Sequence, residues 1–503
     1  MKKLSDRLTG VFYVLFLALF GWLFFNVVFL NPWFDYKPWL ALPLAALWLA
    51  AFVGVFALAG RLAQFWAGHE KRCLLAFLLL LCAVQLFFYW QTAGYPTRDF
   101  ERVYTGAYNY TIAGFIEDPY LDYFYKYPNN MPLMILLQFL FRAIYRVTGL
   151  TNFLVWGALF NAFCLDLGYL FVYLCAKKLG GVRAGVTALA VLGLCIPLQC
   201  YISIFYTDAV TLWFAPFALW LWLCLRGQTS RKKWLLQAAV FGLVVGFGMK
   251  IKYSVVIVLV AILIDGVLRR PRRAAAVGAA ALAGFLLWNS VFDGFMYAHI
   301  LDRAKARDAA TPFLSWVMMA LKGDGTHNAD DNYVIWYWPT KEQKEWQART
   351  EIRRRLAEYG PVGYLEFLNR KGVRSFGTGD LNVMNMAADS PMRQTFLVEG
   401  ISENGRWYDQ FRYLTQGYHL AVFALTLAGA ALALRRRDWS GFVPHLTMFG
   451  LYLFLLVWEA GQRYLLNYMG IFVLCAVFGL LQLDAARARR QAAAAPKQAA
   501  PAP

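Results

Sequence analysis

Two aspartates next to long apolar segments are the residues best suited to chemistry in this chain. Asp99 lies in a polar segment that follows an apolar run, and Asp208 lies between two apolar runs with almost no loop. An ionisable side chain at the edge of an apolar span is costly to desolvate and is typical of a functional site. A carboxylate in such a place activates a hydroxyl group or binds a cation. The alternatives are a solvated loop for Asp99 and a helix N-cap for Asp208.

The loop that contains Asp99 is rich in side chains that bind polar ligands. Carboxylates and amides form hydrogen bonds with hydroxyl groups, and tyrosine rings suit sugar faces or the membrane interface. The candidates for substrate binding in this loop are Glu101, Asp118, Tyr127, Asn129 and Asn130.

Two further polar groups are candidates for binding an anion. Lys250 and Lys252 lie between two apolar runs, on the side where the positive-inside rule does not expect basic residues. Glu459 and Arg463 begin the last apolar run and are spaced to pair on a helix. A lipid-linked phosphate needs such cations. The alternatives are lysines that snorkel to headgroups and an ion pair that only satisfies itself.

The composition is that of a membrane protein. The 503 residues are 60% hydrophobic, and about a dozen apolar runs are long enough to cross roughly 30 Å of hydrocarbon. Basic clusters between these runs explain the net charge of +19 better than nucleic-acid binding does, so we expect no nucleic-acid partner. The eight cysteines are scattered and the five histidines are isolated, which indicates neither a disulfide framework nor a metal-ligand motif.

The basic clusters predict the topology. With twelve spans, every cluster falls on one side, which we take as the cytoplasmic side, together with both termini. Residues 131–150 are apolar but carry Arg142 and Arg146 at helical spacing, and a crossing there would invert every later cluster. We therefore expect an amphipathic helix on the outer surface at this position. The expected spans are residues 9–30, 38–59, 74–91, 153–176, 184–203, 208–226, 234–250, 253–269, 274–292, 417–434, 441–458 and 464–483.

These observations predict an all-α protein that crosses the plasma membrane many times. Residues 1–291 would contain nine spans and a first outer loop at 92–150 with helices next to the membrane. Residues 292–416 would form a small mixed outer domain, and residues 417–485 the last three spans. The low-complexity residues 486–503 would be a disordered cytoplasmic tail.

The order of these motifs resembles that of a known enzyme family. Asp99 opens the first large outer loop, a Tyr-Pro-Asn-Asn element at 127–130 precedes the surface helix, a Tyr-Thr-Asp turn ends at Asp208, and Glu459 and Arg463 open the last span. The pattern is similar to that of multi-spanning C-type (GT-C) glycosyltransferases, and most of all to the glycosyltransferase family 39-like membrane proteins of Gram-positive bacteria. The chain departs from the family because Asp99 follows the third span, whereas the family's acid usually follows the first.

The resemblance implies inverting transfer of a sugar from a polyprenyl-phosphate donor to an acceptor of the cell envelope, on the outer face. The acceptor would be a glycolipid, a polysaccharide, a teichoic acid or a protein. Asp99 would serve as the general base or orient the acceptor, and Asp208 would assist it or bind a divalent cation (Mg²⁺ or Mn²⁺) with it. The outer cations, Lys250, Lys252 and Arg463, would hold the lipid phosphate.

Two other functions compete with this one. A transporter or flippase would place ionisable residues near the bilayer midplane. Asp166 lies in the middle of an expected span and favours that alternative, whereas Asp265 lies near a cytoplasmic end. A scaffold subunit without catalysis would tolerate the loss of both Asp99 and Asp208.

Overall fold

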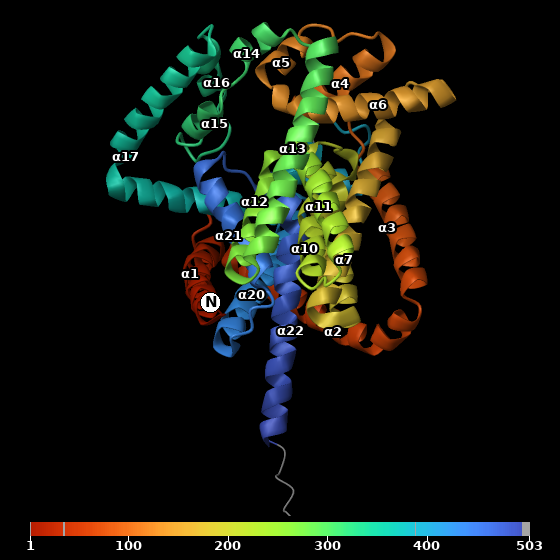
Figure 1. The fold of residues 1–503 in the computed structure, drawn as a ribbon, viewed down its shortest axis with the longest axis vertical. Coiled ribbons are helices and arrows are strands. Elements are labelled where there is room, and N and C mark those ends of the chain that lie inside the picture. The colour runs from red at the N-terminus through yellow and green to blue at the C-terminus, as the bar shows by residue number, and fades with distance from the viewer. Residues whose placement is uncertain (1, 34–35, 388, 495–503) are drawn as a thin grey trace, which may run out of the picture.

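Helices joined by loops make up the protein. The computed structural model describes residues 2–33, 36–387 and 389–494 (Figure 1). Within these ranges no strand forms, and the only β-type pairing is an isolated bridge between Gly94 and Pro391. The prediction of an all-α fold is therefore confirmed for the described residues.

The helices fall into a bundle and three further sets of elements. The bundle contains α1 (Lys2–Phe29), α2 (Pro38–Gly68), α3 (Glu70–Thr92), α7 (Leu154–Gly193), α10 (Phe214–Leu225), α11 (Arg231–Ile251), α12 (Val256–Arg269), α13 (Pro271–His299), α20 (Tyr408–Arg436), α21 (Phe442–Val457) and α22 (Met469–Ala494). The first loop contains α4 (Arg98–Ile112), α5 (Tyr120–Lys126), the 3₁₀-helix η1 (Pro128–Asn130) and α6 (Met131–Thr148). Short connections are α8 (Ile196–Cys200), η2 (Tyr201–Ser203), α9 (Thr207–Val210), η3 (Tyr253–Val255) and η4 (Gln462–Tyr468). The remaining helices are α14 (Arg303–Ala309), α15 (Phe313–Met319), α16 (Ala329–Trp336), α17 (Lys341–Phe376), α18 (Val383–Ala387) and α19 (Phe396–Ile401).

Ten helical segments in the described part of the chain are long and apolar enough to cross a membrane. The list differs from the twelve expected spans for three reasons. First, α7 covers two of them, which are separated by a kink at Gly181, where a φ of 74° favours glycine. Second, α12 and α21 are shorter than a typical span. Third, the segment Pro128–Thr148 is counted among the ten, although we expected it to lie on the surface. The number of crossings stays a prediction.

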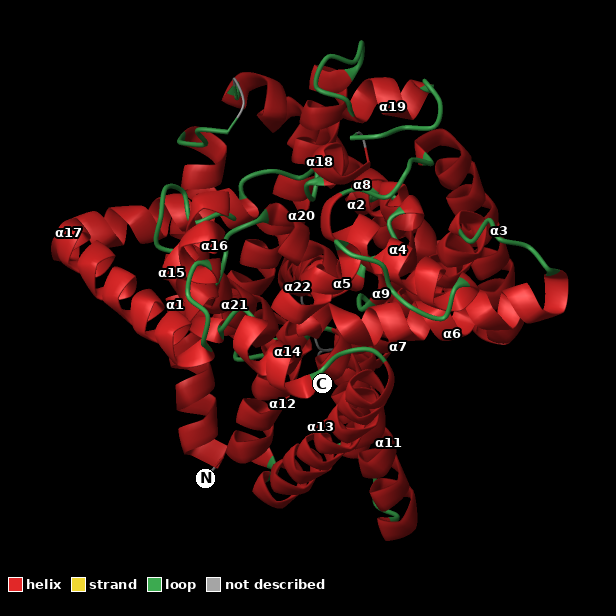
Figure 2. Ribbon diagram, turned by 90° about the horizontal axis from the view of Figure 1, so that it is seen from above, coloured by secondary structure: helices red, strands yellow, loops and turns green. Residues whose placement is uncertain are grey.

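The helices of the first loop form a layer across one end of the bundle. Figure 1 shows α6 lying roughly at right angles to the long helices α3, α7 and α22, with α4 and α5 beside it. Figure 2 shows from above that α6 extends to one side and α17 curves along the other. This orientation of α6 is the one expected for an amphipathic surface helix, since one of its faces is buried against α4.

The described residues of the region 292–416 form helices joined by turns and loops, and a separate outer domain there stays a prediction. Its first residues prolong α13 to His299, and its last residues already belong to α20, which begins at Tyr408. The first half of α17 ends at a kink at Gly360 (φ 57°), which turns the second half back over the bundle. The buried Val373 and Phe376 of that second half belong to the main core.

Close packing of α11 on α13 joins two elements that carry polar side chains. Gly242 and Gly246 of α11 face Ala280 and Gly284 of α13 so closely that an added Cβ would collide with the partner backbone. Small residues allow two helix backbones to approach in this way. The contact places the end of α11, with Lys250, beside the second half of α13.

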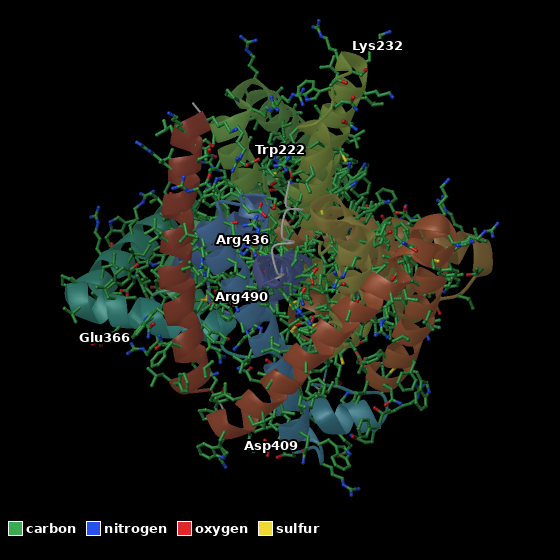
Figure 3. The ribbon with its side chains drawn as sticks, turned by 90° about the horizontal axis from the view of Figure 1, so that it is seen from below. Trp222, Lys232, Glu366, Asp409, Arg436 and Arg490 are labelled. Carbon is green, nitrogen blue, oxygen red and sulfur yellow. The ribbon has the colours of Figure 1, made fainter. Side chains whose placement is uncertain are left out.

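Both ends of the described chain lie on the side of the bundle away from α4, α5 and α6 (Figure 1). Figure 3 views the molecule from that side and labels Lys232, Arg436 and Arg490, which belong to three of the basic clusters expected in the cytoplasm. Residues 486–494 of the expected disordered tail are helical in the structure, because α22 continues through Ala494 in a stretch rich in the strong helix formers Ala, Arg and Gln. Residues 495–503 lie outside the described residues.

Candidate active site

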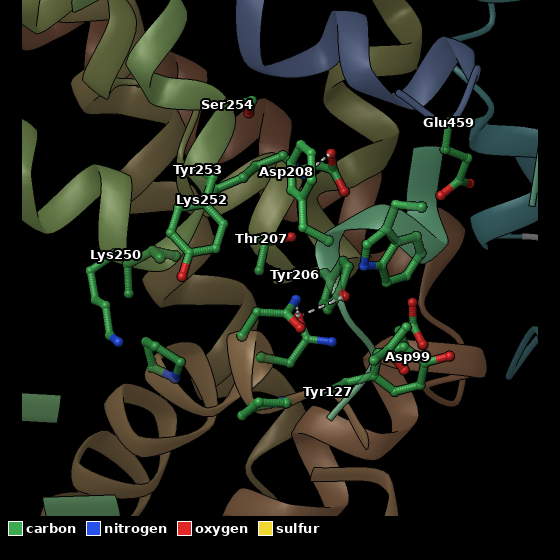
Figure 4. Close-up of a pocket in the computed structure, with 18 of the residues that line it drawn as sticks. Asp99, Tyr127, Tyr206, Thr207, Asp208, Lys250, Lys252, Tyr253, Ser254 and Glu459 are labelled. Atoms are coloured by element: carbon green, nitrogen blue, oxygen red, sulfur yellow. Dashed lines mark hydrogen bonds and ion pairs between the residues drawn. The ribbon is translucent and has the colours of Figure 1, made fainter. Parts of the chain in front are cut away.

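A pocket of about 510 Å³ lies where the first-loop layer meets the bundle (Figure 4). It is lined by side chains of α4, α9, α13 and α15 and of the segments that follow α11 and α21. Most of the side chains predicted to form the site meet here, although they are far apart in the sequence. They are Asp99, Tyr127, Asn129, Asn130, Asp208, Lys250, Lys252, Glu459 and Arg463.

Two predicted substrate-binding residues do not line the pocket. Glu101 lies two residues after Asp99 on α4, which is roughly 200° around a helix, and its carboxylate accepts a hydrogen bond from Tyr120 at 3.1 Å. Asp118 is exposed in the loop before α5. Glu101 and Asp118 were selected because they lie in the same loop as Asp99. In the structure the helix periodicity turns Glu101 away from Asp99, and the course of the loop separates Asp118 from it.

Asp99 lies in the first turn of α4, where the helix dipole favours a carboxylate. Tyr123 donates a hydrogen bond to Asp99 Oδ1 at 3.0 Å, and Asn130 in turn donates to the Tyr123 hydroxyl. Burial, reinforced by the nearby Asp99 charge, raises the pKa of Tyr123 well above its usual value, so Tyr123 stays a donor. No lysine or arginine among the described residues forms an ion pair with Asp99. The negative charge of Asp99 is therefore not balanced by a lysine or arginine of the described residues, which suits a carboxylate that accepts a proton.

The backbone before Asp99 is strained. Arg98 has a φ of 57°, in the left-handed region that residues with a side chain rarely adopt. Its guanidinium forms an ion pair with Asp389 at 2.9 Å. Strained residues cluster at functional sites because the surrounding structure holds them in place. The contact fixes the start of α4 and, with it, the position of Asp99.

Asp208 forms an ion pair with Lys252 at 2.6 Å, with 4% and 13% of the two side chains exposed. Asn467 donates a hydrogen bond to the backbone oxygen of Asp208 at 2.9 Å. The N-cap of α9 is Tyr206, and no side chain caps this helix, so the capping alternative for Asp208 is wrong. Burial lowers the pKa of Lys252, and the Asp208 charge opposes that shift.

Lys250 is held by two side chains that the sequence analysis did not select. It donates to Asn289 Oδ1 at 2.6 Å and pairs with Asp293 Oδ1 at 2.7 Å. Asn289 and Asp293 are four residues apart on α13, and they line the same pocket. Their signal in the sequence is the spacing of two polar residues on one face at the end of a span. Asp293 thus balances the charge of Lys250, as Asp208 does for Lys252.

Glu459 and Arg463 form a loose pair, with 3.9 Å between Arg463 Nη2 and Glu459 Oε1. Tyr464 lies between them: it donates to Glu459 at 3.1 Å and accepts from Arg463 at 3.4 Å. Arg463 lines the pocket, and a guanidinium has five N–H donors, so the contacts found in the described part of the chain leave donors for a ligand. The alternative of a self-satisfied ion pair fits this geometry poorly.

The pocket has two chemically different ends. Figure 4 shows Lys250 at one end, Asp99 and Glu459 at the other, and Asp208 with Lys252 between them. Several aromatic side chains that the sequence analysis did not select also line it, and they include Phe313, Trp316, Phe454 and Trp458.

Asp166, which favoured a transporter, and Asp265 both lie outside the pocket. Asp166 accepts a hydrogen bond from Gln85 at 3.1 Å and does not line the pocket. Asp265 is buried and bound by Arg269 at 2.7 Å and by Trp222 at 2.9 Å. Both carboxylates therefore have local partners of their own.

A divalent cation on Asp99 and Asp208 does not fit these surroundings. No group of three or more His, Cys, Asp or Glu side chains suited to a metal ion occurs in the described ranges. Asp208 Oδ1 already contacts the Lys252 ammonium, so a dication there would lie beside a buried positive charge. The pocket residues present a hydrogen-bonded ion-pair network in place of a metal site.

Comparison with solved structures gives weak likenesses. The chain is similar to the archaeal oligosaccharyltransferase AglB from Archaeoglobus fulgidus, in complex with an inhibitory peptide and a dolichol-phosphate, with a TM-score of 0.41 and 13% identity over 86% of this chain and 53% of that chain. It is also similar to ArnT from Cupriavidus metallidurans bound to undecaprenyl phosphate, with a TM-score of 0.31 and 15% identity over 85% and 81% of the two chains. The chain thus spans about half the length of AglB. Scores of this size do not establish a common fold, so the GT-C, family 39-like and Gram-positive assignments stay predictions.

Comparison by sequence identifies the family. None of the curated proteins matches the chain. A family model described as "conserved hypothetical integral membrane protein" matches residues 4–483. This match and the many apolar helices show an integral membrane protein with several spans. The chain belongs to that family of conserved integral membrane proteins.

Proposed function

We propose that this protein is a membrane glycosyltransferase that moves a sugar from a polyprenyl-phosphate donor to an acceptor of the cell envelope. The reaction takes place on the outer face of the plasma membrane, with both termini in the cytoplasm. The acceptor is a glycolipid, a polysaccharide, a teichoic acid or a protein, and the sugar is a hexose or a pentose.

One observation carries the proposal: a single pocket holds a carboxylate that pairs with no lysine or arginine of the described residues and, a short way along, two partly buried cations. Asp99 is the carboxylate, and Lys252 and Arg463 are the cations. The carboxylate can deprotonate a hydroxyl group, and the cations can stabilise a departing anionic phosphate. The basic clusters at the opposite end of the bundle support the orientation of the pocket toward the outside.

The proposed mechanism is a single displacement. Asp99 takes the proton of the acceptor hydroxyl, whose oxygen forms a bond to the anomeric carbon of the donor sugar. The bond between that carbon and the phosphate oxygen breaks, and its electron pair leaves with the polyprenyl phosphate. Lys252 and Arg463 stabilise the charge that develops on the phosphate. Attack opposite the departing group inverts the anomeric centre.

The other pocket residues position these groups. Asp208 holds the Lys252 ammonium in place, and Glu459 does the same for Arg463 through Tyr464. Tyr127, Asn129 and Asn130 offer hydrogen bonds to sugar hydroxyls at the Asp99 end. Lys250 contacts the phosphate through its remaining N–H bonds while Asp293 balances its charge.

The proposal is tested by sugar transfer with purified protein in detergent. A panel of polyprenyl-phosphate sugars is supplied with candidate acceptors, and release of polyprenyl phosphate is measured for the wild type and for Asp99→Asn. Loss of a general base lowers the rate by roughly 10²- to 10⁴-fold. Asp122→Asn is the matched control, because Asp122 lies in the same loop, is half exposed and pairs with Lys126 outside the pocket.

The outcomes of this assay distinguish the proposed activity, the role of Asp99 and the transporter alternative. Turnover by the wild type and by Asp122→Asn, with none by Asp99→Asn, supports both the activity and the base. Turnover by all three proteins contradicts the role of Asp99. Movement of intact donor across a vesicle membrane without sugar release assigns the protein to the transporter class instead.

A further inference from the structure

The Asp99 end of the pocket is bounded by an aromatic wall, defined here as Phe313 and Trp316 of α15, Phe454 of α21 and Trp458 just after α21. The two indole rings are nearly parallel, with an interplanar angle of 25° and 5.7 Å between their centroids. The rings of Phe313 and Phe454 lie 5.2 and 5.6 Å from that of Trp458. These contacts make one continuous apolar face, and the proposed mechanism uses none of its members.

Polar groups adjoin this face directly. Trp458 precedes Glu459 in the chain, and Trp316 lies 5.8 Å from the ring of Tyr127. Asp99 and Glu459 are at the same end of the pocket in Figure 4, opposite Lys250. A flat aromatic surface next to carboxylates and amides matches a pyranose ring, whose C–H face is apolar and whose hydroxyl groups donate hydrogen bonds.

An isoprenoid tail fits the other end better. Beside a hydrocarbon chain, the Asp99 carboxylate would lose hydration without gaining a hydrogen bond, whereas Asp293 at the other end keeps its bond to Lys250. Next to Lys250, Tyr253 is 57% exposed, and the adjoining helices α11 and α13 present exposed Leu243, Leu286 and Leu287. A donor with its tail on that side and its phosphate at Lys252 would extend its sugar toward the aromatic wall.

The wall is held in place before any ligand arrives. Ala460, two residues after Trp458, donates a backbone hydrogen bond to Gly325 at 2.7 Å, which ties the segment after α15 to the start of η4. Thr311, just before α15, donates to the backbone of Lys126 at 2.9 Å. Both sides of the wall are therefore fixed relative to the first-loop layer, and preorganised surfaces lose less entropy when a ligand binds.

We infer that the aromatic wall binds the face of a pyranose ring, with Trp316 and Trp458 as the stacking residues and with Asp99 and Glu459 as partners for the ring hydroxyls. The inference rests on the proposed function for the identity of the pocket. The ring belongs to the donor or to the acceptor, and the kinetic test distinguishes the two sources.

The kinetic test uses Trp316→Leu and Trp458→Leu, which keep an apolar side chain but remove the flat ring, and Trp316→Phe, which restores one. The control is Trp346→Leu, because Trp346 is 59% exposed on α17 and does not line the pocket. The expected result is a roughly fivefold to tenfold rise in KM for one substrate in both leucine variants, with Trp316→Phe close to wild type. A rise for the donor assigns the ring to the donor, and a rise for the acceptor assigns it to the acceptor. Unchanged KM values, or an equal loss in Trp316→Phe, would overturn the inference.

A binding test needs no turnover and separates this inference from the proposed function. Saturation-transfer NMR on the protein in nanodiscs is recorded with methyl glucopyranoside, methyl mannopyranoside and methyl galactopyranoside, and separately with farnesyl phosphate. We expect transfer to the ring protons of at least one glycoside in wild type and in Trp346→Leu, and a loss of at least threefold in the Trp316→Leu and Trp458→Leu variants. No glycoside signal in wild type, or a loss confined to farnesyl phosphate, would overturn it. Binding of glycosides by a protein that never transfers sugar would leave the wall in place and contradict only the proposed function.

Discussion

The buried pair of Asp208 and Lys252 should contribute to stability in a way that only a double-mutant cycle can reveal. The two groups are 2.6 Å apart and almost fully buried, so removal of one charge leaves the other without a counter-ion. Breaking such a pair costs about 3–5 kcal/mol, whereas replacing both members by neutral groups is often close to neutral. We therefore expect Lys252→Met alone to destabilise the protein more than the combination of Asp208→Asn with Lys252→Met.

The size of the single effect can be bounded. A buried carboxylate that loses its counter-ion escapes most of the penalty by taking up a proton. Protonation of an aspartate with the reference pKa of about 3.9 costs about 4 kcal/mol at pH 7 and about 1.5 kcal/mol at pH 5, at 1.36 kcal/mol per unit. The loss caused by Lys252→Met should therefore not exceed about 4 kcal/mol at pH 7 and should shrink by more than half at pH 5.

The assay is equilibrium unfolding of purified protein in mixed detergent and SDS micelles, followed by circular dichroism at both pH values. Four proteins complete the cycle: wild type, Asp208→Asn, Lys252→Met and the double variant. Additive single losses, or a Lys252→Met loss that is the same at pH 7 and pH 5, would refute the account of a desolvated pair. Release of polyprenyl phosphate should stay absent in the stable double variant, since Lys252 is proposed to bind the phosphate.

Three more predictions concern other parts of the molecule. Burial lowers the pKa of Lys371 to about 7 from its usual 10.5, so between these pH values the unfolded chain binds more protons than the folded protein does. The free energy of unfolding should therefore rise with pH by up to about 1.4 kcal/mol per pH unit in that window. The Lys371→Met variant should lack this rise. Asp331→Asn should cost about 3–5 kcal/mol in the same unfolding assay, because it weakens the buried pair in which Asp331 binds Arg355 at 2.7 and 2.8 Å; a change below about 1 kcal/mol would mean that water reaches the arginine. Sugar transfer should proceed in the presence of EDTA and gain nothing from Mg²⁺ or Mn²⁺, and a strict requirement for either ion would restore a metal role for Asp99 and Asp208.

The sequence allows the site to be predicted where polar residues interrupt apolar runs. Asp99, Asp208, Lys252 and Arg463 stand out because a charge beside a membrane span is costly, and the structure brings all four to one pocket. The surface orientation expected for the helix at 131–150 came from the same reasoning about charge, since the side on which the later basic clusters lie depends on it.

Pairings and aromatic contacts could not be predicted in this way. A sequence in which 17% of the residues are aromatic gives no reason to choose Trp316 and Trp458, which meet only through tertiary packing. The partners of Lys250 lie on α13 and reach it because glycines on both helices allow close approach, which is a contact between distant segments.

The near balance of charge in the pocket has a consequence for how an anionic lipid arrives. Four carboxylates (Asp99, Asp208, Asp293 and Glu459) face three cationic side chains (Lys250, Lys252 and Arg463), and most of these cations are already paired. Such an arrangement produces little long-range attraction for a negative headgroup. The encounter would then be governed by lateral diffusion within the bilayer, and the capture rate would follow membrane fluidity much more closely than ionic strength.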